Sequence, residues 1–168
     1  MTTISRIRFG VCVLVWCNGQ LLLMKRKGSH GAGTWSVPGG RLEPEDSSPH
    51  ARAHQELLEE VGLWLAHPNL EVVEWSHANW EDPSHGHQNW VTLYFEVGIG
   101  AHPSPTGDGH YVRIREPDKC SELRWVYPTE LLKMFADAPE SLFEPFRSFI
   151  VQHGARLMVD ARKRVVIE

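Results

Sequence analysis

The sequence has few cysteines, no excess of basic charge and no long apolar run. The three cysteines, Cys12, Cys17 and Cys120, are scattered without Cys-x-x-Cys spacing, so we expect neither a disulfide framework nor a cysteine metal cage. A reducing, cytoplasmic compartment is therefore favoured. The formal net charge of −4 argues against a nucleic-acid partner, which would require a basic face. The run Val11–Trp16 is far too short to span a membrane, and no signal-peptide pattern surrounds it.

The composition is that of a globular protein: of the 168 residues, 42% are hydrophobic and 23% are charged. This length accommodates one substantial core, and no repeat or linker divides the chain, so we expect a single domain over residues 1–168. Residues 154–168 are a candidate C-terminal extension that packs on a partner, with a terminal strand pair as the alternative. Seven tryptophans are a high number, and rings outside a core often stack on ligands.

Periodicity predicts most of the regular elements. Residues 6–17 alternate loosely and are rich in valine, which indicates a strand. Asn18-Gly19 is a strong signal for a two-residue hairpin turn, and the returning strand, residues 20–25, is apolar on both faces. The other expected strands are residues 70–78, 90–98, 111–115 and 123–126, and the other expected helices are residues 128–135 and 141–153.

The polar stretch Asn79–Gln88 lies between two of these expected strands. It contains His85 and His87 on either side of Gly86, and imidazoles are common metal ligands. No further ligand is close to them in the sequence. A loop is therefore the better interpretation of this stretch than a metal site.

The stretch Gly39–Leu63 has the clearest helix signals in the chain. Ser48 is a candidate N-cap, Pro49 stands at the first helical position and Gly62 is a C-terminal stop. These residues predict a helix that ends at about Val61. The paired glycines at the start of the stretch permit either a close backbone approach or a positive φ, and they leave a carbonyl oxygen able to bind a metal.

Three carboxylates of this helix, Glu56, Glu59 and Glu60, occur at positions i, i+3 and i+4 and therefore share one face. Clustered carboxylate oxygens suit a hard divalent cation such as Mg2+ or Mn2+, which would relieve the repulsion between them. A solvated acidic helix face has the same spacing, so three acids alone do not decide between the two interpretations. The residues expected to point away from the acids, into the core, are Leu57, Leu58 and Val61.

A basic cluster, Lys25-Arg26-Lys27, follows the second expected strand and precedes Gly28-Ser29. Cations beside small, flexible residues suit an anion-binding site. A solvated loop has the same composition, and the cluster alone favours neither interpretation.

The stretch Gly39–Leu63 resembles the Nudix box, the loop–helix signature of the Nudix hydrolases. That signature reads Gly, five residues, Glu, seven residues, Arg-Glu, an aliphatic, any residue, Glu-Glu, any residue, Gly and an aliphatic. The matching positions are Gly40, Glu56, Leu57, Glu59, Glu60, Gly62 and Leu63. Further segments resemble, in order, the MutT-homologue nucleoside triphosphate diphosphatases and plant relatives that act on prenyl diphosphates. These segments are residues 22–40, 90–95, 116–120 and 142–146, so the resemblance covers most of residues 9–147.

The resemblance implies an α+β fold, an α-β-α sandwich with a mixed, curved β-sheet between helices and a loop-helix-loop Nudix box. It also implies Mg2+-dependent cleavage of a nucleoside diphosphate linked to another group, with Mn2+ as a substitute cofactor. The small-molecule partner would be a nucleotide. Relatives are often homodimers.

Site roles carry over by position. The resemblance implies that Glu56, Glu59 and Glu60 are catalytic metal ligands, that Glu56 activates water and that the Gly40 carbonyl is a further ligand. Lys25, Arg26 and Lys27 stand where relatives hold the phosphate chain. The residues expected near the base are Trp35, Thr92, Tyr94 and Glu144, with Trp80 and Trp90 as further aromatic candidates.

The sequence departs from the signature in two places within the box. Gln55 replaces the arginine that precedes Glu56, and the preceding loop is one residue longer, so Glu45 and Asp46 are both candidates for the loop glutamate. Arg52 stands four positions before Glu56 on the same helix face. We expect it to compensate in part for the missing arginine.

Glu144 is a third departure, because relatives carry a tryptophan near the base pocket at this position. A carboxylate there would favour bases that present N–H donors; a solvated helix residue is the alternative. The expected reaction is hydrolysis of nucleoside triphosphates to monophosphate and pyrophosphate. The alternatives are hydrolysis of a nucleotide-sugar or prenyl diphosphate, and nucleotide binding with little catalysis. Retention of all three helix carboxylates argues against the last of these.

Overall fold

The structure, a computed structural model, describes residues 6–28, 30–65, 70–100 and 112–163. In this part of the chain, seven strands form one mixed sheet in the order β3-β2-β1-β6-β5, while β4 pairs with β1 and β7 pairs with β2. The strands are β1 (Arg8–Cys17), β2 (Gln20–Arg26), β3 (Trp35–Ser36), β4 (Gly39–Arg41), β5 (Glu71–Asp82), β6 (Gly86–Gly98) and β7 (Cys120–Val126). The helices are α1 (Pro49–Val61), α2 (Pro128–Asp137), the 3-10 helix η1 (Pro139–Ser141) and α3 (Glu144–Lys163).

Strand β1 runs through the middle of the sheet. Asn18 and Gly19, with φ of 48° and 75°, turn it back into β2, which confirms the hairpin that the sequence predicts. Along its other edge β1 pairs in parallel with β6. Since both edges of β1 are paired and both of its faces are covered, an almost uninterrupted apolar sequence is the expected composition.

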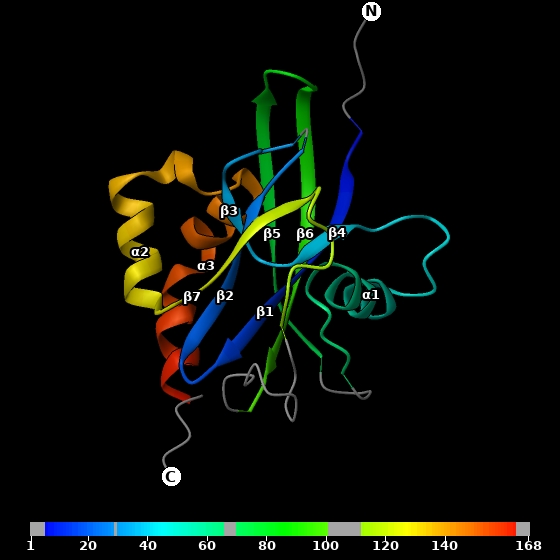
Figure 1. The fold of residues 1–168 in the computed structure, drawn as a ribbon. Coiled ribbons are helices and arrows are strands. Elements are labelled where there is room, and N and C mark those ends of the chain that lie inside the picture. The colour runs from blue at the N-terminus through cyan, green and yellow to red at the C-terminus, as the bar shows by residue number, and fades with distance from the viewer. Residues whose placement is uncertain (1–5, 29, 66–69, 101–111, 164–168) are drawn as a thin grey trace, which may run out of the picture.

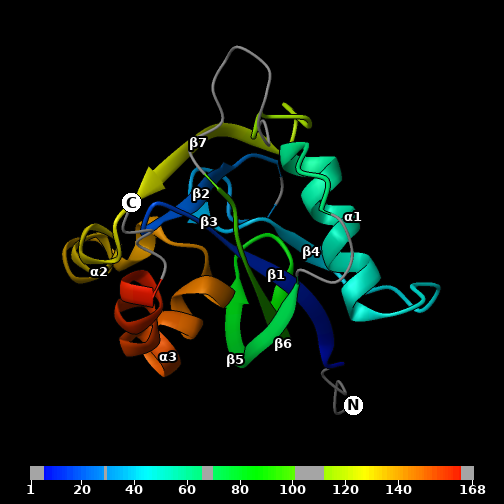
Figure 2. The same cartoon turned by 90° about the horizontal axis from the view of Figure 1, so that it is seen from below.

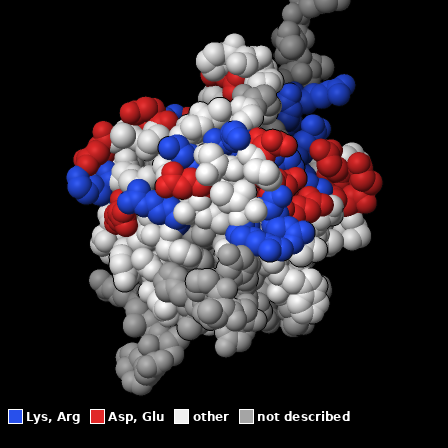
Figure 3. Space-filling view, viewed as in Figure 1, with Lys and Arg blue, Asp and Glu red and all other residues white. Residues whose placement is uncertain are grey.

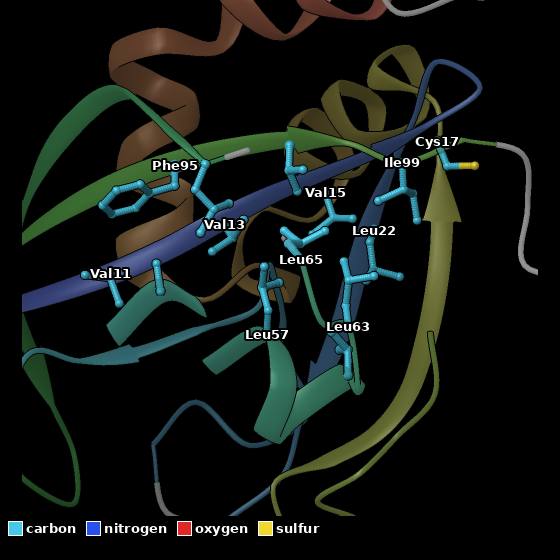
Figure 4. Close-up of a cluster of buried hydrophobic side chains, with 14 residues drawn as sticks. Val11, Val13, Val15, Cys17, Leu22, Leu57, Leu63, Leu65, Phe95 and Ile99 are labelled. Carbon is cyan, nitrogen blue, oxygen red and sulfur yellow. The ribbon is translucent and has the colours of Figure 1, made fainter. Parts of the chain in front are cut away.

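Alternate side chains of β1 enter two separate cores. Val11, Val13 and Val15 pack with residues of α1 in the cluster drawn in Figure 4. Leu14 and Trp16 project from the opposite face into a second cluster, to which α2 and α3 contribute. Figures 1 and 2 show α1 on one side of the sheet and the pair α2 and α3 on the other, which confirms the predicted α-β-α sandwich.

Helix α1 has the boundaries that its capping residues predict. The Ala51 N–H donates to Ser48 Oγ at 3.1 Å, and Pro49 opens the first turn. Gly62 adopts the left-handed conformation with φ of 71°, and its N–H donates to carbonyl groups of the last turn. None of the described helices is both long enough and apolar enough to cross a membrane.

The stretch predicted as a loop, residues 79–88, is mostly strand, so that prediction was wrong. Strands β5 and β6 continue antiparallel as far as the pair Asp82 and Gly86, leaving a short turn between them. Most side chains near this tip are exposed. An exposed hairpin needs no apolar alternation, and its polar sequence therefore carries no strand signal.

The end of the chain is also different from expectation. Helix α3 continues through Gly154 to Lys163, so the terminal strand pair is wrong within the described residues. Residues 112–115 are not a strand, while Tyr111 lies outside the described residues. Instead, the N–H groups of Arg113 and Arg115 donate to the carbonyl oxygens of Val61 and Glu60 at 3.0 Å, which satisfies the C-terminal end of α1.

Candidate active site

Strand β4 approaches helix α1 so closely that only glycine fits between them. The Gly39 N–H donates to Glu60 Oε2 at 2.8 Å. A Cβ atom on Gly40 would lie 1.9 Å from Glu56 Oε1, and one on Gly39 would lie 2.2 Å from the Val11 carbonyl oxygen. Neither glycine has a positive φ, so the close approach is what requires glycine here.

Two of the three helix carboxylates are buried beside these glycines. Glu56 and Glu60 are 3% and 5% exposed, whereas Glu59 is half-buried and accepts a hydrogen bond from Gln55 Nε2 at 2.6 Å. Glu56 and Glu60 lie within the buried stripe of α1 rather than opposite it, and Leu58, predicted to face the core, is 43% exposed. The stripe consists of Ala53, Glu56, Leu57, Glu60 and Val61.

Burial changes the acidity of both buried carboxyl groups. The pKa of Glu60 rises to about 8, first because of burial and then because Glu56 repels its charge; the Gly39 N–H and Arg26 act in the opposite direction. Burial also raises the pKa of Glu56, which Arg52 opposes. Two adjacent carboxyl groups that resist ionisation together are a frequent feature of functional sites, and a cation stabilises their ionised form.

The stability of the metal-free protein is expected to fall as the pH rises from 6.5 to 8. The native state retains a proton on Glu60 in this range, whereas the unfolded state, with an ordinary carboxyl pKa, has already lost it. The loss in free energy of unfolding is expected to be about 2 kcal/mol, at 1.36 kcal/mol per pH unit. Urea unfolding at several pH values in EDTA measures it.

The Glu60→Gln variant is the control for this pH dependence, because an amide does not titrate. The variant is expected to show a much smaller slope between pH 6.5 and 8. Saturating Mg2+ is expected to flatten the slope of the wild type, since the metal binds the ionised form. An equal slope in the variant and the wild type would contradict the attribution of the pH dependence to the raised pKa of Glu60.

Arg52 occupies the position that the sequence analysis proposed for it. Its Nη2 group donates to Glu56 Oε1 one helical turn away, and its positive charge lowers the pKa of Glu56. Gln55, which replaces the signature arginine, is exposed and contacts Glu59 instead. The guanidinium group that holds Glu56 therefore comes from position 52.

Replacing Arg52 with Ala is expected to weaken metal binding about tenfold, the effect typical of losing a group that orients a ligand. The buried Glu56 carboxylate would lose its cationic partner, so its pKa would rise further and the activity profile would shift toward alkaline pH. Mn2+ titration measures the affinity, and a pH–rate profile measures the shift. Gln55→Ala is the matched control on the same helix. If Arg52→Ala kept the wild-type Mn2+ affinity, Arg52 would not compensate for the missing signature arginine.

A cavity of about 450 Å3 opens beside Gly39 and Gly40. Ligand pockets of proteins commonly range from about 300 to 1,000 Å3. Its wall combines cationic and aromatic side chains: the Arg26 guanidinium lies 4.0 Å from the Phe143 ring centroid, and that of Arg8 lies 5.9 Å from the Trp90 centroid. Other polar and aromatic residues of the wall are His30, Arg41, Trp80, His85, Gln88 and Thr92.

Charges on the surface are mixed. On the face shown in Figure 3, Lys and Arg side chains are interspersed with Asp and Glu side chains. No broad basic surface is visible on that face, in agreement with the formal net charge of −4.

The three basic residues predicted to bind phosphate separate in the structure. Arg26 lines the cavity, and its Nε donates to the His30 carbonyl oxygen at 3.0 Å. Lys25 Nζ lies outside the cavity, 4.0 Å from Glu122 Oε2. Lys27 Nζ donates to the Pro117 carbonyl oxygen at 3.1 Å. Successive side chains at the end of a strand point in opposite directions, so a run of three cations does not form one patch.

The family model of the NUDIX domain matches residues 6–146. The chain belongs to the Nudix hydrolase family. Members of this family generally use a divalent metal, and the signature positions that this chain matches include Gly40 of β4 and the three carboxylates of α1 described above.

Solved structures share this Nudix fold. The MutT protein from Methanosarcina mazei Go1 has a TM-score of 0.66 and 21% identity, covering 95% of this chain and 98% of that chain. The NUDIX domain of Shewanella oneidensis NrtR, complexed with ADP ribose, has a TM-score of 0.64 and 17% identity, covering 93% and 90%.

A third similar structure is the bifunctional NMN adenylyltransferase/ADP ribose pyrophosphatase from Francisella tularensis, complexed with AMP and a Mn ion. Its TM-score is 0.65 and its identity is 18%, over 93% of this chain but only 43% of that chain. Identities this low establish the shared fold alone.

The residues of this Nudix chain that were expected near the base lie in two environments. Thr92, 3% exposed, lines the cavity together with Trp80 and Trp90. Tyr94 is fully buried, and its hydroxyl group donates to the Pro145 carbonyl oxygen at 3.0 Å, so it supports the wall from behind. Trp35 is 8% exposed and packs in the core rather than lining the cavity.

Glu144 is close to the cavity without lining it. The residues on either side, Phe143 and Pro145, both contribute to the wall. The Glu144 side chain is half-buried and forms an ion pair with Arg147 on the next turn of α3. Its carboxylate therefore already has a cationic partner.

Glu116 is a carboxylate that the sequence analysis did not assign. Its Oε2 is buried without a hydrogen-bond partner, and its charge raises the pKa of Glu60, so the two groups act on each other. Lys119 Nζ pairs with Glu116 Oε1 at 2.8 Å. The sequence pointed to this region only through the resemblance of segment 116–120 to relatives, and that resemblance gave no reason to select Glu116 from the segment.

Proposed function

We propose that the chain is a Mg2+-dependent hydrolase that converts nucleoside triphosphates to nucleoside monophosphates and pyrophosphate. The observation that carries this proposal is the contact between Gly39-Gly40 and the buried pair Glu56 and Glu60, beside a cavity with cationic and aromatic walls. Carboxylates that bind a metal next to cations that bind phosphate are what phosphoanhydride cleavage requires. The aromatic rings suit a stacked base.

The residues fit a divalent cation. Two buried carboxyl groups with raised pKa values lie together, and the buried Glu116 Oε2 has no hydrogen-bond partner. An all-oxygen set of this kind suits Mg2+ or Mn2+. Glu56, Glu60 and the Gly40 carbonyl would hold the ion, with Glu59 beside them at the surface. The ion, when bound, acidifies a water molecule and offsets charge on the phosphates.

The chain's own residues supply the remaining steps. Glu56 accepts the proton of the attacking water at its carboxylate, while Arg52 holds that carboxylate in position. Arg26, on the cavity wall, neutralises charge that develops on the phosphate oxygens. The N–H of Gly39 orients Glu60 through its hydrogen bond.

A reducing, cytoplasmic compartment is consistent with the free cysteines Cys12, Cys17 and Cys120.

Hydrolysis of a different diphosphate compound is the second candidate. The residues that line the cavity do not select one class of ligand, and similar structures are complexed with ADP ribose and with AMP. The test is release of phosphate-containing products from a panel of nucleoside triphosphates, nucleotide sugars, ADP-ribose and prenyl diphosphates, with Mg2+ and without it. The proposed reaction gives pyrophosphate and a monophosphate from triphosphates. If only another compound of the panel were hydrolysed, the proposed triphosphate substrate would be replaced by the class of that compound.

The panel also separates an enzyme from a binding module. Nucleotide binding without turnover, unchanged in Glu56→Gln, would indicate a Nudix-fold binder. Turnover that is lost in Glu56→Gln while binding persists supports the enzyme.

Glu144→Gln is expected to change the preference among the four bases modestly, because its ion pair with Arg147 lies beside the wall residues Phe143 and Pro145. The measurement is the ratio of kcat/KM values across the triphosphates. Glu140→Gln is the matched control, since Glu140 is exposed. If Glu144→Gln and Glu140→Gln both kept the wild-type ratios of kcat/KM among the triphosphates, Glu144 would be excluded as a determinant of base preference.

A further inference from the structure

Two segments that are far apart in the sequence bring His30, Asp82 and His85 together beside the cavity, which the two histidines line. His30 belongs to the connection between β2 and β3, whereas the other two residues lie at the tip of the β5–β6 hairpin. Their ligand atoms all lie within 4.8 Å of one another. His87, which the sequence places near His85, instead has its Nδ1 atom 2.8 Å from Glu81 Oε1. One partner of His85, Asp82, lies three residues before it, whereas the other, His30, comes from a position that sequence proximity does not indicate.

The three side chains lie against one another. The two imidazole rings are stacked, with centroids 3.7 Å apart and an interplanar angle of 27°. His85 Nδ1 lies 3.0 Å from Asp82 Oδ1, and His30 Nδ1 lies 3.7 Å from Oδ2. The second distance is too long for a hydrogen bond. One carboxylate thus faces two imidazole nitrogens but bonds directly to only one of them.

The charge states of these groups suit a metal. Hydrogen bonds from the Ser84 N–H and from His85 lower the pKa of Asp82, which keeps its carboxylate ionised. Burial and the neighbouring His85 lower the pKa of His30, and a neutral imidazole ring offers one nitrogen lone pair to a metal. The Asp82 side chain is only 11% exposed, which limits competition from water.

We propose that His30, Asp82 and His85 form a second divalent-metal site, separate from the carboxylates of α1, that binds ions of the Zn2+, Co2+ and Ni2+ type. Two imidazole nitrogens with one carboxylate oxygen favour these ions over Mg2+, which prefers oxygen ligands. Three protein ligands leave a coordination position open, as in catalytic zinc sites. Because both histidines line the cavity, this position is available to a ligand bound there.

An ion at this site would join two segments that line the cavity. Figure 1 shows the tip of the β5–β6 hairpin extending past the other strands, and the residues of its turn are exposed. The connection that carries His30 is attached to the body through the bond from Arg26 Nε to the His30 carbonyl oxygen. Metal binding would therefore fix the hairpin tip to the connection that carries His30.

The site is tested by titrating the full-length protein with Zn2+ and Co2+ while excess Mg2+ occupies the α1 carboxylates. Calorimetry is expected to show one Zn2+ per chain, and Co2+ is expected to give the visible absorption of an imidazole-ligated ion. His30→Ala and His85→Ala are each expected to lower the affinity at least about tenfold, since even outer-shell changes have this effect. Circular dichroism verifies that both substitutions leave the fold intact.

His87→Ala, on the same hairpin but outside the cluster, is the matched control and is expected to keep wild-type affinity. Hydrogen exchange adds a structural readout: Zn2+ is expected to slow exchange of the amides in residues 82–88 in the wild type but not in His30→Ala. Zinc affinity that is unchanged in both cluster variants, or lost equally in His87→Ala, would overturn the proposal. Neither readout uses turnover, so the outcome is independent of the proposed hydrolase activity.

Discussion

Replacing Glu56 with Gln is expected to lower kcat by about 100- to 10,000-fold, the range that general acid–base groups supply. The amide retains the shape of the carboxyl group and its hydrogen-bonding contact with Arg52, but it can neither accept a proton nor contribute charge to a metal. Since the side chain is 3% exposed, no water molecule can easily take its place. The measurement is pyrophosphate release from the best triphosphate of the panel, under saturating Mg2+.

The control for this variant must separate chemistry from folding. Removing one buried negative charge from the pair with Glu60 is expected to leave the metal-free fold at least as stable as the wild type, since Glu56 raises the pKa of Glu60 by repulsion. Glu140→Gln, the same change at an exposed position, is expected to leave kcat unaltered. A Glu56→Gln protein that is folded and retains more than a tenth of wild-type activity would refute the proposed role of Glu56 as the group that accepts the proton of the attacking water.

Replacing Gly40 with Ala is expected to reduce kcat by about 100-fold or more, because a displacement of about 1 Å at a catalytic group has this effect. The new Cβ atom would lie 1.9 Å from Glu56 Oε1, far inside contact distance, so the carboxylate or strand β4 must move. The Mn2+ affinity is expected to fall with the rate, since the same carboxylate would serve the metal. Thermal unfolding and Mn2+ titration accompany the kinetic measurement.

Gly100→Ala is the matched control, because a Cβ atom there meets no atom of the described residues within 4 Å. It is expected to leave the rate and the melting temperature almost unchanged. Gly39→Ala offers a contrast: its Cβ would press on the Val11 carbonyl oxygen, a backbone atom, so the loss is expected mainly in stability. If Gly40→Ala kept wild-type kinetics, the close packing of β4 on α1 would not matter for catalysis.

Local signals in the sequence predicted the parts of the fold that depend on neighbouring residues. The hairpin at Asn18-Gly19 follows from residues that tolerate positive φ, and the ends of α1 follow from Ser48 and Gly62. The three helix acids were found in the same way. The burial of Glu56 and Glu60 was not predicted, because it depends on how closely the Gly39-Gly40 strand approaches the helix.

Contacts between distant parts of the chain were beyond the reach of the sequence. The approach of His30 to Asp82 and His85 joins two loops through the tertiary fold, and no periodicity encodes it. The β5–β6 tip was missed because exposed strands have no apolar alternation. Helix α3 was expected to end at residue 153, but it continues through Gly154; a Cβ there would meet Leu132 of α2 at 3.6 Å, an ordinary contact distance, so the packing of the two helices does not require glycine.

The parallel pairing of β1 with β6 has a consequence for how the molecule assembles. Arg8 pairs with Trp90 and Trp16 with Gly98, so the middle of the sheet closes only when chain segments from opposite halves of the domain meet. Contacts of such long sequence separation slow folding, because the entropy of the intervening chain is lost before they form. An amino-terminal fragment ending at Leu63 would contain the glycines and all three acids of α1, yet it would leave one edge of β1 open to aggregation. The Nudix signature is contiguous in sequence, but the contacts that hold it in place come from the whole domain.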